Sequence, residues 1–226
     1  RSIECGILED PWEAPPEEIY EWTTPLSNTP AESEIITIEF SQGIPIKLNG
    51  TISDPIEIVN TLNTIAGKHG IGRIDMVEDR IVGIKSREIY ESPAASVLIE
   101  AHNALESLTL TREQRDMKAI IDQEYAKMVY DGHWFSRFHA DIKSLIDSSQ
   151  KFVNGTVRLQ LWHGNAIVNG IESTESLYDP KLATYSEDDE FDQSIAKGFI
   201  AIWGQPLKTQ AKAQKHVDDK NINDIS

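Results

Sequence analysis

Alternating apolar and polar residues predict a pair of strands near the start of the chain. Residues 34–40, Glu-Ile-Ile-Thr-Ile-Glu-Phe, are β-branched and alternating, which is typical of a half-buried strand. Ser41-Gln-Gly43 forms a turn, and residues 44–48 return as a second strand in which Pro45 favours an edge position. Asn49-Gly50 marks the next turn, so we expect the two strands to pair antiparallel.

The spacing of apolar residues then changes to that of a helix. Ser53 or Asp54 can cap its start, with Pro55 at the first helical position. The apolar residues recur at intervals of three, which predicts an amphipathic buried stripe formed by Ile56, Val59, Leu62 and Ile65. Gly67 and Gly70 are expected to end this helix.

The middle of the chain predicts two strand pieces followed by three helices. Residues 73–90 are extended and β-branched, with an interruption at Glu78-Asp79-Arg80. Ser92 and Pro93 can start a helix that reaches about Leu108. Thr111 begins a second helix, which extends to about Tyr130 before Gly132 breaks it, and a third lies within residues 137–151.

The last third is expected to be rich in strands. Residues 155–162 and 166–171 read as a hairpin joined by His163-Gly164-Asn165. The segment 172–195 is polar and acidic, and the apolar run 198–203 predicts one more strand. After Pro206 a polar tail is compatible with a helix to about residue 217. Because such a helix is marginal alone, we expect it to dock on another subunit.

The first 33 residues differ from the rest because residues 9–33 contain five prolines. Proline opposes helices and central strands, so we expect an extended arm anchored by Trp12, Tyr20 and Trp22. The irregular order of strands and helices predicts the α+β class: a mixed, largely antiparallel sheet with packed helices and a C-terminal helical tail used in oligomerisation. We divide the chain into an extended segment 1–33, an α+β domain 34–204 and a tail 205–226.

Composition excludes several classes of function. The 226 residues carry a net charge of −16, which opposes binding to nucleic acid or to anionic membranes and favours solubility. No apolar run is long enough to span a membrane, and the N-terminus does not resemble a signal peptide. The chain has one cysteine, Cys5, which we interpret as a small core residue in a protein of the reducing cytoplasm. The chain starts with Arg1 rather than Met, and we interpret this N-terminus as an internal position of a longer protein.

Common catalytic and cofactor motifs are missing from the sequence. It contains no Gly-rich loop of the Walker or dinucleotide type and no Gly-x-Ser-x-Gly motif. Its six histidines show no metal-ligand spacing, and a single cysteine excludes a multi-cysteine zinc site. We therefore expect no metal site and no catalytic or cofactor-binding residue within this chain.

Chemistry is concentrated in residues 66–93, where charged and polar groups occur on otherwise strand-like sequence. Glu78 can accept hydrogen bonds from an ammonium group, and Tyr90 can donate to or accept from an uncharged polar group. The structural alternative is a charged hairpin with solvated side chains, because runs of charge are usually exposed.

The same segment resembles the argininosuccinate synthase family. The resemblance rests on an almost continuous match through residues 66–75, Glu78, 83–87 and the Ile-Tyr-Glu-Ser-Pro of 89–93, and on residues 1–11, 155–157 and 173–178. These motifs occur in the family's order. The resemblance covers nearly the whole chain and is weakest after about residue 205.

The resemblance implies an activity that needs more than this chain. The family ligates citrulline to aspartate in arginine biosynthesis: the ureido oxygen of citrulline attacks the α-phosphate of ATP, and the aspartate amine then displaces AMP. The ATP loop, which works with Mg²⁺, and the aspartate-binding residues belong to an N-terminal domain that this chain lacks. The family assembles as a cytoplasmic homotetramer, with the C-terminal tail reaching neighbouring subunits.

Three positions of this chain match the family's citrulline-binding residues: Ser2, Glu78 and Tyr90. Glu78 is expected to bind the α-ammonium group, with Ser2 and Tyr90 as hydrogen-bonding partners. The structural alternatives are a solvated chain end for Ser2 and a half-buried core position for Tyr90.

The sequence leaves three functions open. In the first, the chain is part of the ligase and is inactive by itself. In the second, it is a binding or regulatory module that has kept a pocket for a ureido amino acid. In the third, it is a pure assembly domain whose polar cluster is structural.

Overall fold

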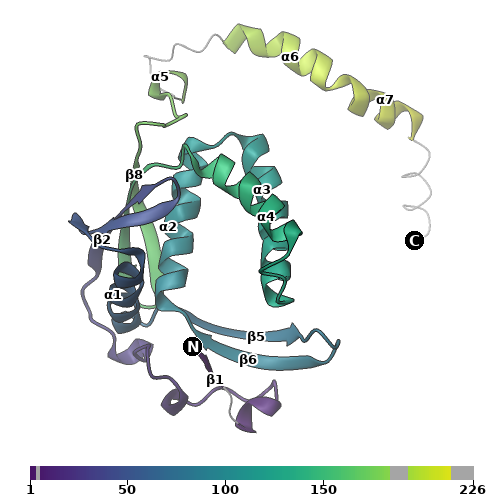
Figure 1. Ribbon diagram of the computed structural model, residues 1–226. Helices are drawn as coiled ribbons and strands as arrows, with labels where there is room; N and C mark the ends of the chain where they lie inside the picture. Colours follow the sequence, from purple (N-terminus) through teal and green to yellow (C-terminus); the bar gives the residue numbers. More distant parts are fainter. Residues whose placement is uncertain (4–5, 184–192, 215–226) are drawn as a thin grey trace, which may run out of the picture. The chain divides into compact units, whose positions relative to one another are not determined.

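The computed structural model describes residues 1–3, 6–183 and 193–214 (Figure 1). The chain divides into two compact units, Arg1–Leu177 and Tyr178–Ser226. Cys5 lies outside the described residues, so its expected place in the core has no structural counterpart here. The first unit contains two antiparallel sheets and four long helices. The α+β class predicted from the sequence is confirmed.

The larger sheet has five strands in the order β4-β3-β2-β7-β8. The strands are β2 (Glu34–Ser41), β3 (Ile44–Leu48), β4 (Thr51–Ile52), β7 (Gly155–Trp162) and β8 (Asn165–Glu172). The register between β2 and β7 runs from Glu34 opposite Leu161 to Phe40 opposite Gly155, which joins residues 115 to 127 positions apart in sequence. The two predicted hairpins are confirmed, because β2 pairs antiparallel with β3 and β7 pairs antiparallel with β8. The short strand β4 extends the sheet beyond β3.

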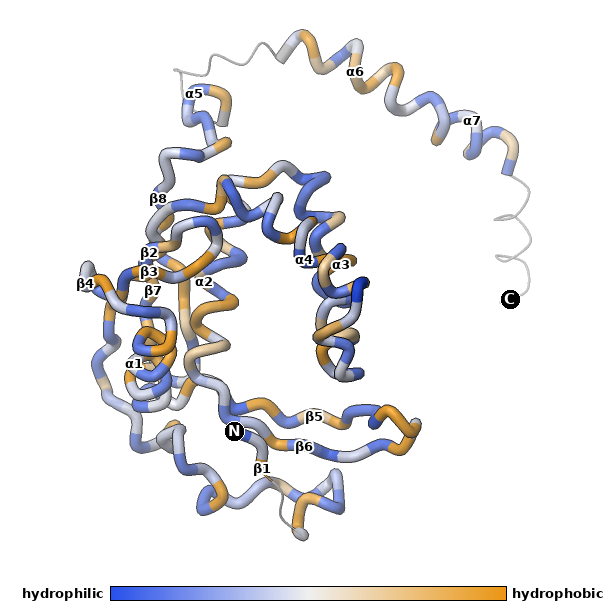
Figure 2. Tube along the Cα trace, viewed as in Figure 1, coloured by the Kyte–Doolittle hydropathy of each residue, from blue (hydrophilic) through white to orange (hydrophobic). Residues whose placement is uncertain are grey.

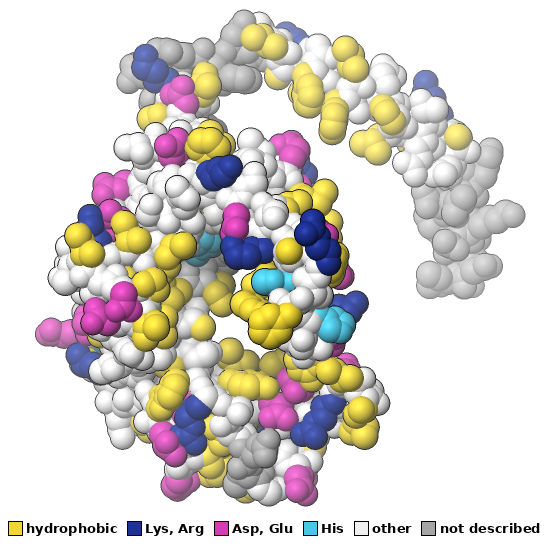
Figure 3. All heavy atoms as spheres, viewed as in Figure 1, with side chains coloured by type: hydrophobic (Ala, Val, Ile, Leu, Met, Phe, Trp, Pro, Cys, Tyr) yellow, Lys and Arg dark blue, Asp and Glu magenta, His cyan; other side chains and the backbone are white. Residues whose placement is uncertain are grey.

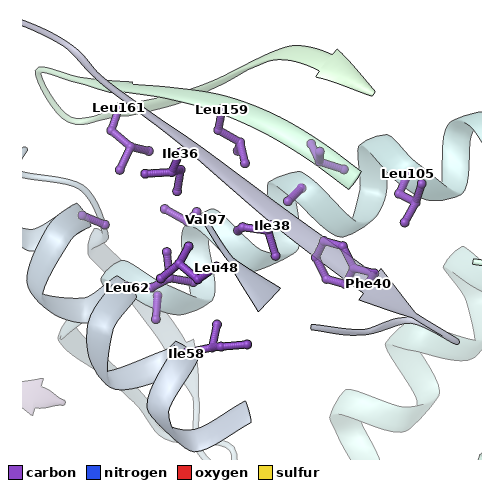
Figure 4. Close-up of a cluster of buried hydrophobic side chains, with 14 of the residues drawn as sticks. Ile36, Ile38, Phe40, Leu48, Ile58, Leu62, Val97, Leu105, Leu159 and Leu161 are labelled. Carbon is purple, nitrogen blue, oxygen red and sulfur yellow. The ribbon is translucent and has the colours of Figure 1, made fainter. Parts of the chain in front are cut away.

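Helices α1 (Pro55–Lys68) and α2 (Pro93–Thr109) cover one face of this sheet. The inward-facing residues of β2 and β7 meet both helices in one continuous core (Figure 4). Its members include Ile36, Ile38, Phe40, Leu48, Ile58, Leu62, Val97, Leu105, Leu159 and Leu161. Burial of these apolar side chains is the main force that stabilises the first unit.

The buried face of α1 differs from the predicted stripe. Ile56 is 72% exposed and Val59 is also exposed, whereas Ile58 and Leu62 are fully buried. The helix thus packs along the line of residues four apart, Ile58, Leu62 and Ala66, rather than along residues three apart. The small residues Ala66 and Gly67 carry no strong hydrophobic signal, yet they allow close approach at the end of the helix. The predicted start is confirmed, because the Asp54 side chain accepts hydrogen bonds from two backbone N–H groups at 2.8 and 3.1 Å.

Two further helices, α3 (Arg112–Tyr130) and α4 (Arg137–Gln150), form a helical hairpin (Figure 1). Thr111 and Gln114 form a reciprocal capping box at the start of α3, as the sequence around Thr111 predicts. The Ser136 side chain caps α4. The predicted extents of α2, α3 and α4 are confirmed to within about two residues.

The second sheet has the order β1-β6-β5 and contains the residues singled out by the sequence. Its strands are β1 (Ser2–Ile3), β5 (Arg73–Asp79) and β6 (Lys85–Glu91). The interruption expected at residues 78–80 is wrong for Glu78 and Asp79, which pair with Ser86 and Lys85. The strands turn instead at residues 80–84, where Gly83 has a φ of 78°. Charged side chains at a strand end do not prevent pairing, because they face solvent.

The N-terminal arm runs beneath this second sheet through three short 3₁₀ helices, at Gly6–Glu9, Glu17–Ile19 and Leu26–Asn28. Ile19 and Tyr20 pack on a small core made of Ile3, Leu8 and Ile89. Tyr20 therefore anchors the arm as expected. Trp12 does not, because its side chain is 91% exposed, and Trp22 is half-exposed.

The second unit contains α5 (Pro180–Ala183), a 3₁₀ helix at Gln193–Ile195, α6 (Ala196–Trp203) and α7 (Gln205–Ala213). The strand predicted at 198–203 is wrong, because these residues form α6. In a continuous apolar run this short, the spacing of apolar residues cannot distinguish a strand from a helix. The backbone satisfies its own hydrogen bonds in a helix, whereas a strand needs a neighbour. The helix predicted after Pro206 is confirmed to Ala213, and residues 215–217 lie outside the described residues.

Candidate functional site

Strand register places the three predicted site residues on one face of the second sheet. Ser2 lies opposite Tyr90, and Tyr90 lies opposite Ile74. Glu78 lies opposite Ser86, four residues along both strands from the Ile74–Tyr90 pair. Successive side chains alternate between the two faces, so Ser2, Glu78 and Tyr90 all point to the same side.

Tyr90 and Glu78 contact each other directly. The Tyr90 hydroxyl donates a hydrogen bond to Oε2 of Glu78 at 3.2 Å. Burial raises the pKa of Tyr90, and the hydrogen bond and negative charge of Glu78 raise it further. The phenol therefore stays protonated at neutral pH and orients the carboxylate. The structure brings these two predicted residues together, and places Ser2 beside Tyr90.

Alternation also reveals residues that motif reasoning missed. Ile74, Met76, Ser86 and Glu88 share the face with Glu78 and Tyr90. The Ser86 hydroxyl donates to Oε1 of Glu88 at 3.1 Å and accepts from Nε of Arg80, also at 3.1 Å. This cluster holds the far end of the hairpin beside Glu78. Once β5 and β6 are assigned their correct bounds, alternation along the strands identifies these residues.

The hairpin tip lies close to the end of α3. The Tyr130 hydroxyl donates to the backbone oxygen of Asp79 at 3.4 Å. The turn beyond it is hydrophobic, as the orange end of the β5–β6 hairpin in Figure 2 shows. Its exposed apolar side chains are those of Ile81, Val82 and Ile84. The face that carries Glu78 and Tyr90 is thus bordered by the last turn of α3.

The opposite face of the hairpin is tied to the N-terminal arm through Arg87. Its guanidinium makes two hydrogen bonds to the Asp75 carboxylate, at 2.9 and 2.7 Å. The same side chain donates to the backbone oxygens of Asp10 and Glu13 at 2.9 and 2.8 Å. The hydrogen bonds from Arg87 hold the pKa of Asp75 below its usual value. The arm therefore supports the sheet from behind.

A cavity of about 570 Å³ lies along β6, lined by Arg80, Glu88 and, from the N-terminal arm, Gly6, Leu8 and Glu9. Its lining includes Ser86 and Glu88, which share the face of Glu78 and Tyr90, but not Ser2, Glu78 or Tyr90 themselves. Over the described ranges, no group of three or more His, Cys, Asp or Glu side chains is arranged to hold a metal ion. None of the helices that the structure describes is long and apolar enough to cross a membrane.

The arrangement suits recognition of a polar ligand rather than bond making. Glu78 offers a carboxylate for a cationic group, and Tyr90 and Ser2 offer hydroxyls. Burial and the Glu78 carboxylate raise the pKa of the Tyr90 phenol, which favours its protonated, hydrogen-bonding form over a phenolate nucleophile.

Comparison with known proteins identifies the family. The family described as Arginosuccinate synthase C-terminal domain matches residues 1–210. An argininosuccinate synthase of Dehalococcoides mccartyi is 49% identical over 223 residues, covering 99% of this chain and 55% of the relative. Those of Bacillus cytotoxicus and Staphylococcus aureus are each 51% identical, covering 96% of this chain and 55% and 53% of the relatives. The chain thus spans about half the length of these curated relatives, and it belongs to the argininosuccinate synthase family, of which it carries the C-terminal domain.

Proposed function

We propose that the chain supplies the citrulline-binding face of an argininosuccinate synthase, the ligase that joins citrulline and aspartate with release of AMP and pyrophosphate. The observation that carries the proposal is the Tyr90–Glu78 hydrogen bond on the face that also holds Ser2. Membership of the family supports the same function. The whole enzyme would serve arginine biosynthesis in the cytoplasm.

Each residue has a distinct role in the proposed site. The Glu78 carboxylate binds the α-ammonium group of citrulline in a charge-assisted hydrogen bond. Tyr90 orients Glu78 and, with Ser2, contacts the ligand through its hydroxyl. Following the family resemblance, we place the sites for ATP, Mg²⁺ and aspartate in the part of the relatives' length that this chain does not cover.

We also propose that residues 205–226, together with α6, form an oligomerisation tail of a homotetramer. Hydrophobic side chains lie along α6 and α7 (Figure 3). The large ones are 60–76% exposed: Phe199, Ile200, Ile202, Trp203 and Leu207. Short helices with such exposed apolar faces are marginal alone and are stabilised by docking on another surface, here a second subunit.

Calorimetry with L-citrulline tests the proposed site in the full-length protein. Glu78→Gln should weaken binding by about thirtyfold to 140-fold, because a hydrogen bond to a charged group contributes about 2–3 kcal/mol. Glu100→Gln is the matched control, since Glu100 is exposed on α2, away from this face. Equal binding by the wild type and Glu78→Gln would reject the site, and absence of binding by the wild type would favour a pure assembly domain.

A second experiment separates the ligase from a stand-alone binding module. We expect this chain by itself, mixed with citrulline, aspartate and Mg-ATP, to release no pyrophosphate, whereas the full-length protein does. The physical reason is that catalysis of adenylation depends on stabilising phosphate charge, and this chain carries a net charge of −16. Pyrophosphate release by the chain alone would contradict the proposal.

A further inference from the structure

The face of the second sheet opposite Tyr90 carries two charged side chains, Arg73 and Glu91, that the proposed function does not use. Arg73 and Glu91 are direct cross-strand partners on β5 and β6. Both side chains reach the buried hydroxyl of Thr23 in the N-terminal arm. Thr23 Oγ1 donates to Oε1 of Glu91 at 2.7 Å and accepts from Nε of Arg73 at 2.8 Å.

Glu91 is the centre of this arrangement. Its side chain is 0% exposed, and it accepts hydrogen bonds from the backbone N–H groups of residues 21, 22 and 23 at 3.1, 2.9 and 2.9 Å. Burial acts to raise the pKa of Glu91, but the Thr23 hydroxyl and the three N–H groups outweigh it and hold the pKa below its usual value. The carboxylate is therefore charged, both of its oxygens accept hydrogen bonds, and the Arg1 guanidinium lies 3.8 Å from Oε2.

Arg73 holds the same piece of the arm from the other strand. Its guanidinium donates to the backbone oxygen of Thr23 at 3.0 Å and forms an ion pair with Glu17 at 2.9 Å. It also lies over the ring of Tyr20, 3.7 Å from the ring centre. Every hydrogen bond of Arg73 named here is thus made to the arm.

The arm in turn is fixed to α1 and hence to the main core. The backbone N–H of Thr24 donates to the oxygen of Gly67 at 2.9 Å. A Cβ at Gly67 would lie 2.1 Å from the backbone oxygen of Trp22, so the two backbones approach as closely as glycine permits. The residues Thr23, Arg73 and Glu91, which we call the root cluster, therefore connect the small sheet to the larger domain.

The root cluster lies next to the residues of the proposed site along each strand. Glu91 directly follows Tyr90, and Arg73 directly precedes Ile74, the cross-strand partner of Tyr90. Fixing the two side chains below the sheet fixes the backbone from which Tyr90 points above it. Tyr90 must span four residues of strand to reach Glu78, so a small rotation of its backbone would break their 3.2 Å contact.

We propose that the root cluster is a positioning unit for the citrulline site, acting through the direction of Tyr90. The proposal rests on the proposed function. It assigns to Thr23, a residue of the proline-rich arm on the far side of the sheet, control over a ligand that it does not touch. A displacement of about 1 Å at a binding group reduces function by up to about a hundredfold, so a modest shift at Tyr90 is sufficient.

The test is a double-mutant cycle read out as the Kd for L-citrulline, measured by calorimetry in the full-length protein. Thr23→Val keeps the shape of the side chain but removes the hydroxyl and both of its hydrogen bonds to charged groups. It should raise Kd about tenfold, less than the full loss of two such bonds, because Thr23 acts on the ligand only through Tyr90. Thr23→Ser restores the hydroxyl and should bind within about twofold of the wild type. Thr64→Val is the matched control, because the Thr64 hydroxyl only donates to Asn60 within α1.

The decisive comparison is made in the Tyr90→Phe background, where the hydroxyl that contacts Glu78 is absent. If the root cluster acts through Tyr90, Thr23→Val should change Kd by less than about twofold there, because coupled residues are not additive. A merely structural loosening would raise Kd by the same factor in both backgrounds, and that result would overturn the proposal. Arg73→Lys keeps the charge but loses the Nε contact with Thr23. It replaces Thr23→Val in the double-mutant cycle if Thr23→Val does not fold.

Failure of this proposal can be told apart from failure of the proposed function. If the wild type binds citrulline and Tyr90→Phe weakens binding, but Thr23→Val has no effect or an additive effect, only the positioning role is wrong. If the wild type does not bind citrulline, the proposed site and its positioning unit are both rejected.

Discussion

Replacing Glu91 by glutamine should loosen the N-terminal arm at one defined place. The change keeps the size of the side chain and removes its charge. Oε1 of Glu91 accepts three hydrogen bonds, from the N–H groups of Trp22 and Thr23 and from the Thr23 hydroxyl. Oε2 accepts one, from the N–H of Glu21. A glutamine can keep the first three with its oxygen, but its NH₂ group must then face the N–H of Glu21.

The size of the effect follows from these contacts. A buried donor left unsatisfied costs about 1–3 kcal/mol, and hydrogen bonds to a charged acceptor are stronger by about 1 kcal/mol each than bonds to a neutral one. The lower cost of burying an amide offsets part of this loss. We expect local opening of the arm to become easier by about 2–4 kcal/mol.

The loss should depend on pH in a direction fixed by the lowered pKa of Glu91. A carboxyl whose folded pKa is lowered stabilises the protein above its unfolded pKa, and this stabilisation is lost as pH falls through the folded value. The difference between wild type and Glu91→Gln should therefore be constant between about pH 7 and pH 5, and should shrink below about pH 4.

Hydrogen exchange of single amides measures this opening directly. In Glu91→Gln the amides of Trp22 and Thr23 should exchange at least about thirtyfold faster than in the wild type, since about 1.4 kcal/mol corresponds to a factor of ten. Amides of β2 and β7 should be unchanged, and Glu100→Gln serves as the control for a change of charge at an exposed position. If the amides of Trp22 and Thr23 keep their wild-type rates, Glu91 does not hold the arm and the reasoning is refuted.

Other variants test the core, a helix cap and the close backbone approach at Gly67. Leu62→Ala should destabilise the protein by about 2–5 kcal/mol in urea unfolding, whereas Ile56→Ala should change stability by less than about 0.5 kcal/mol; equal effects would contradict the observed buried face of α1. Asp54→Ala should cost about 1 kcal/mol by the same measurement, through loss of two capping hydrogen bonds, and no loss would argue against the cap. Gly67→Ala should displace the arm at a cost of about 1–3 kcal/mol and speed exchange at Thr24, while Gly198→Ala, which has open space in α6, should be neutral or stabilising.

Local signals in the sequence were sufficient for most elements of the first unit. Alternation found β2, β3, β7 and β8, and capping residues such as Asp54 and Thr111 marked helix starts, because these features depend on neighbouring residues alone. The strand predicted at 198–203 is wrong because the spacing of apolar residues in so short a segment does not distinguish a strand from a helix. The anchoring role predicted for Trp12 is wrong because an aromatic residue in an arm does not reveal whether a surface lies beneath it.

The candidate site was predictable in part. The resemblance to a family indicated Ser2, Glu78 and Tyr90, and alternation could have placed them on one face once the hairpin bounds were known. The contact between Tyr90 and Glu78, and the meeting of Thr23 with Arg73 and Glu91, depend on register and on the path of the arm. These relations join residues 12 to 68 positions apart, so no local pattern contains them.

Because β6 is the middle strand of its sheet, it fixes the register on both sides, with β1 and with β5. Loss of a single residue between Ser86 and Tyr90 would exchange the two faces, turning Tyr90 towards the arm and Glu91 towards the ligand side. The turn at 80–84 lies outside this constraint, because residues inserted there do not change the pairing register of β5 with β6. During evolution of the family, insertions and deletions should therefore collect in that turn and be excluded from β6, even in lineages whose sequences have diverged widely.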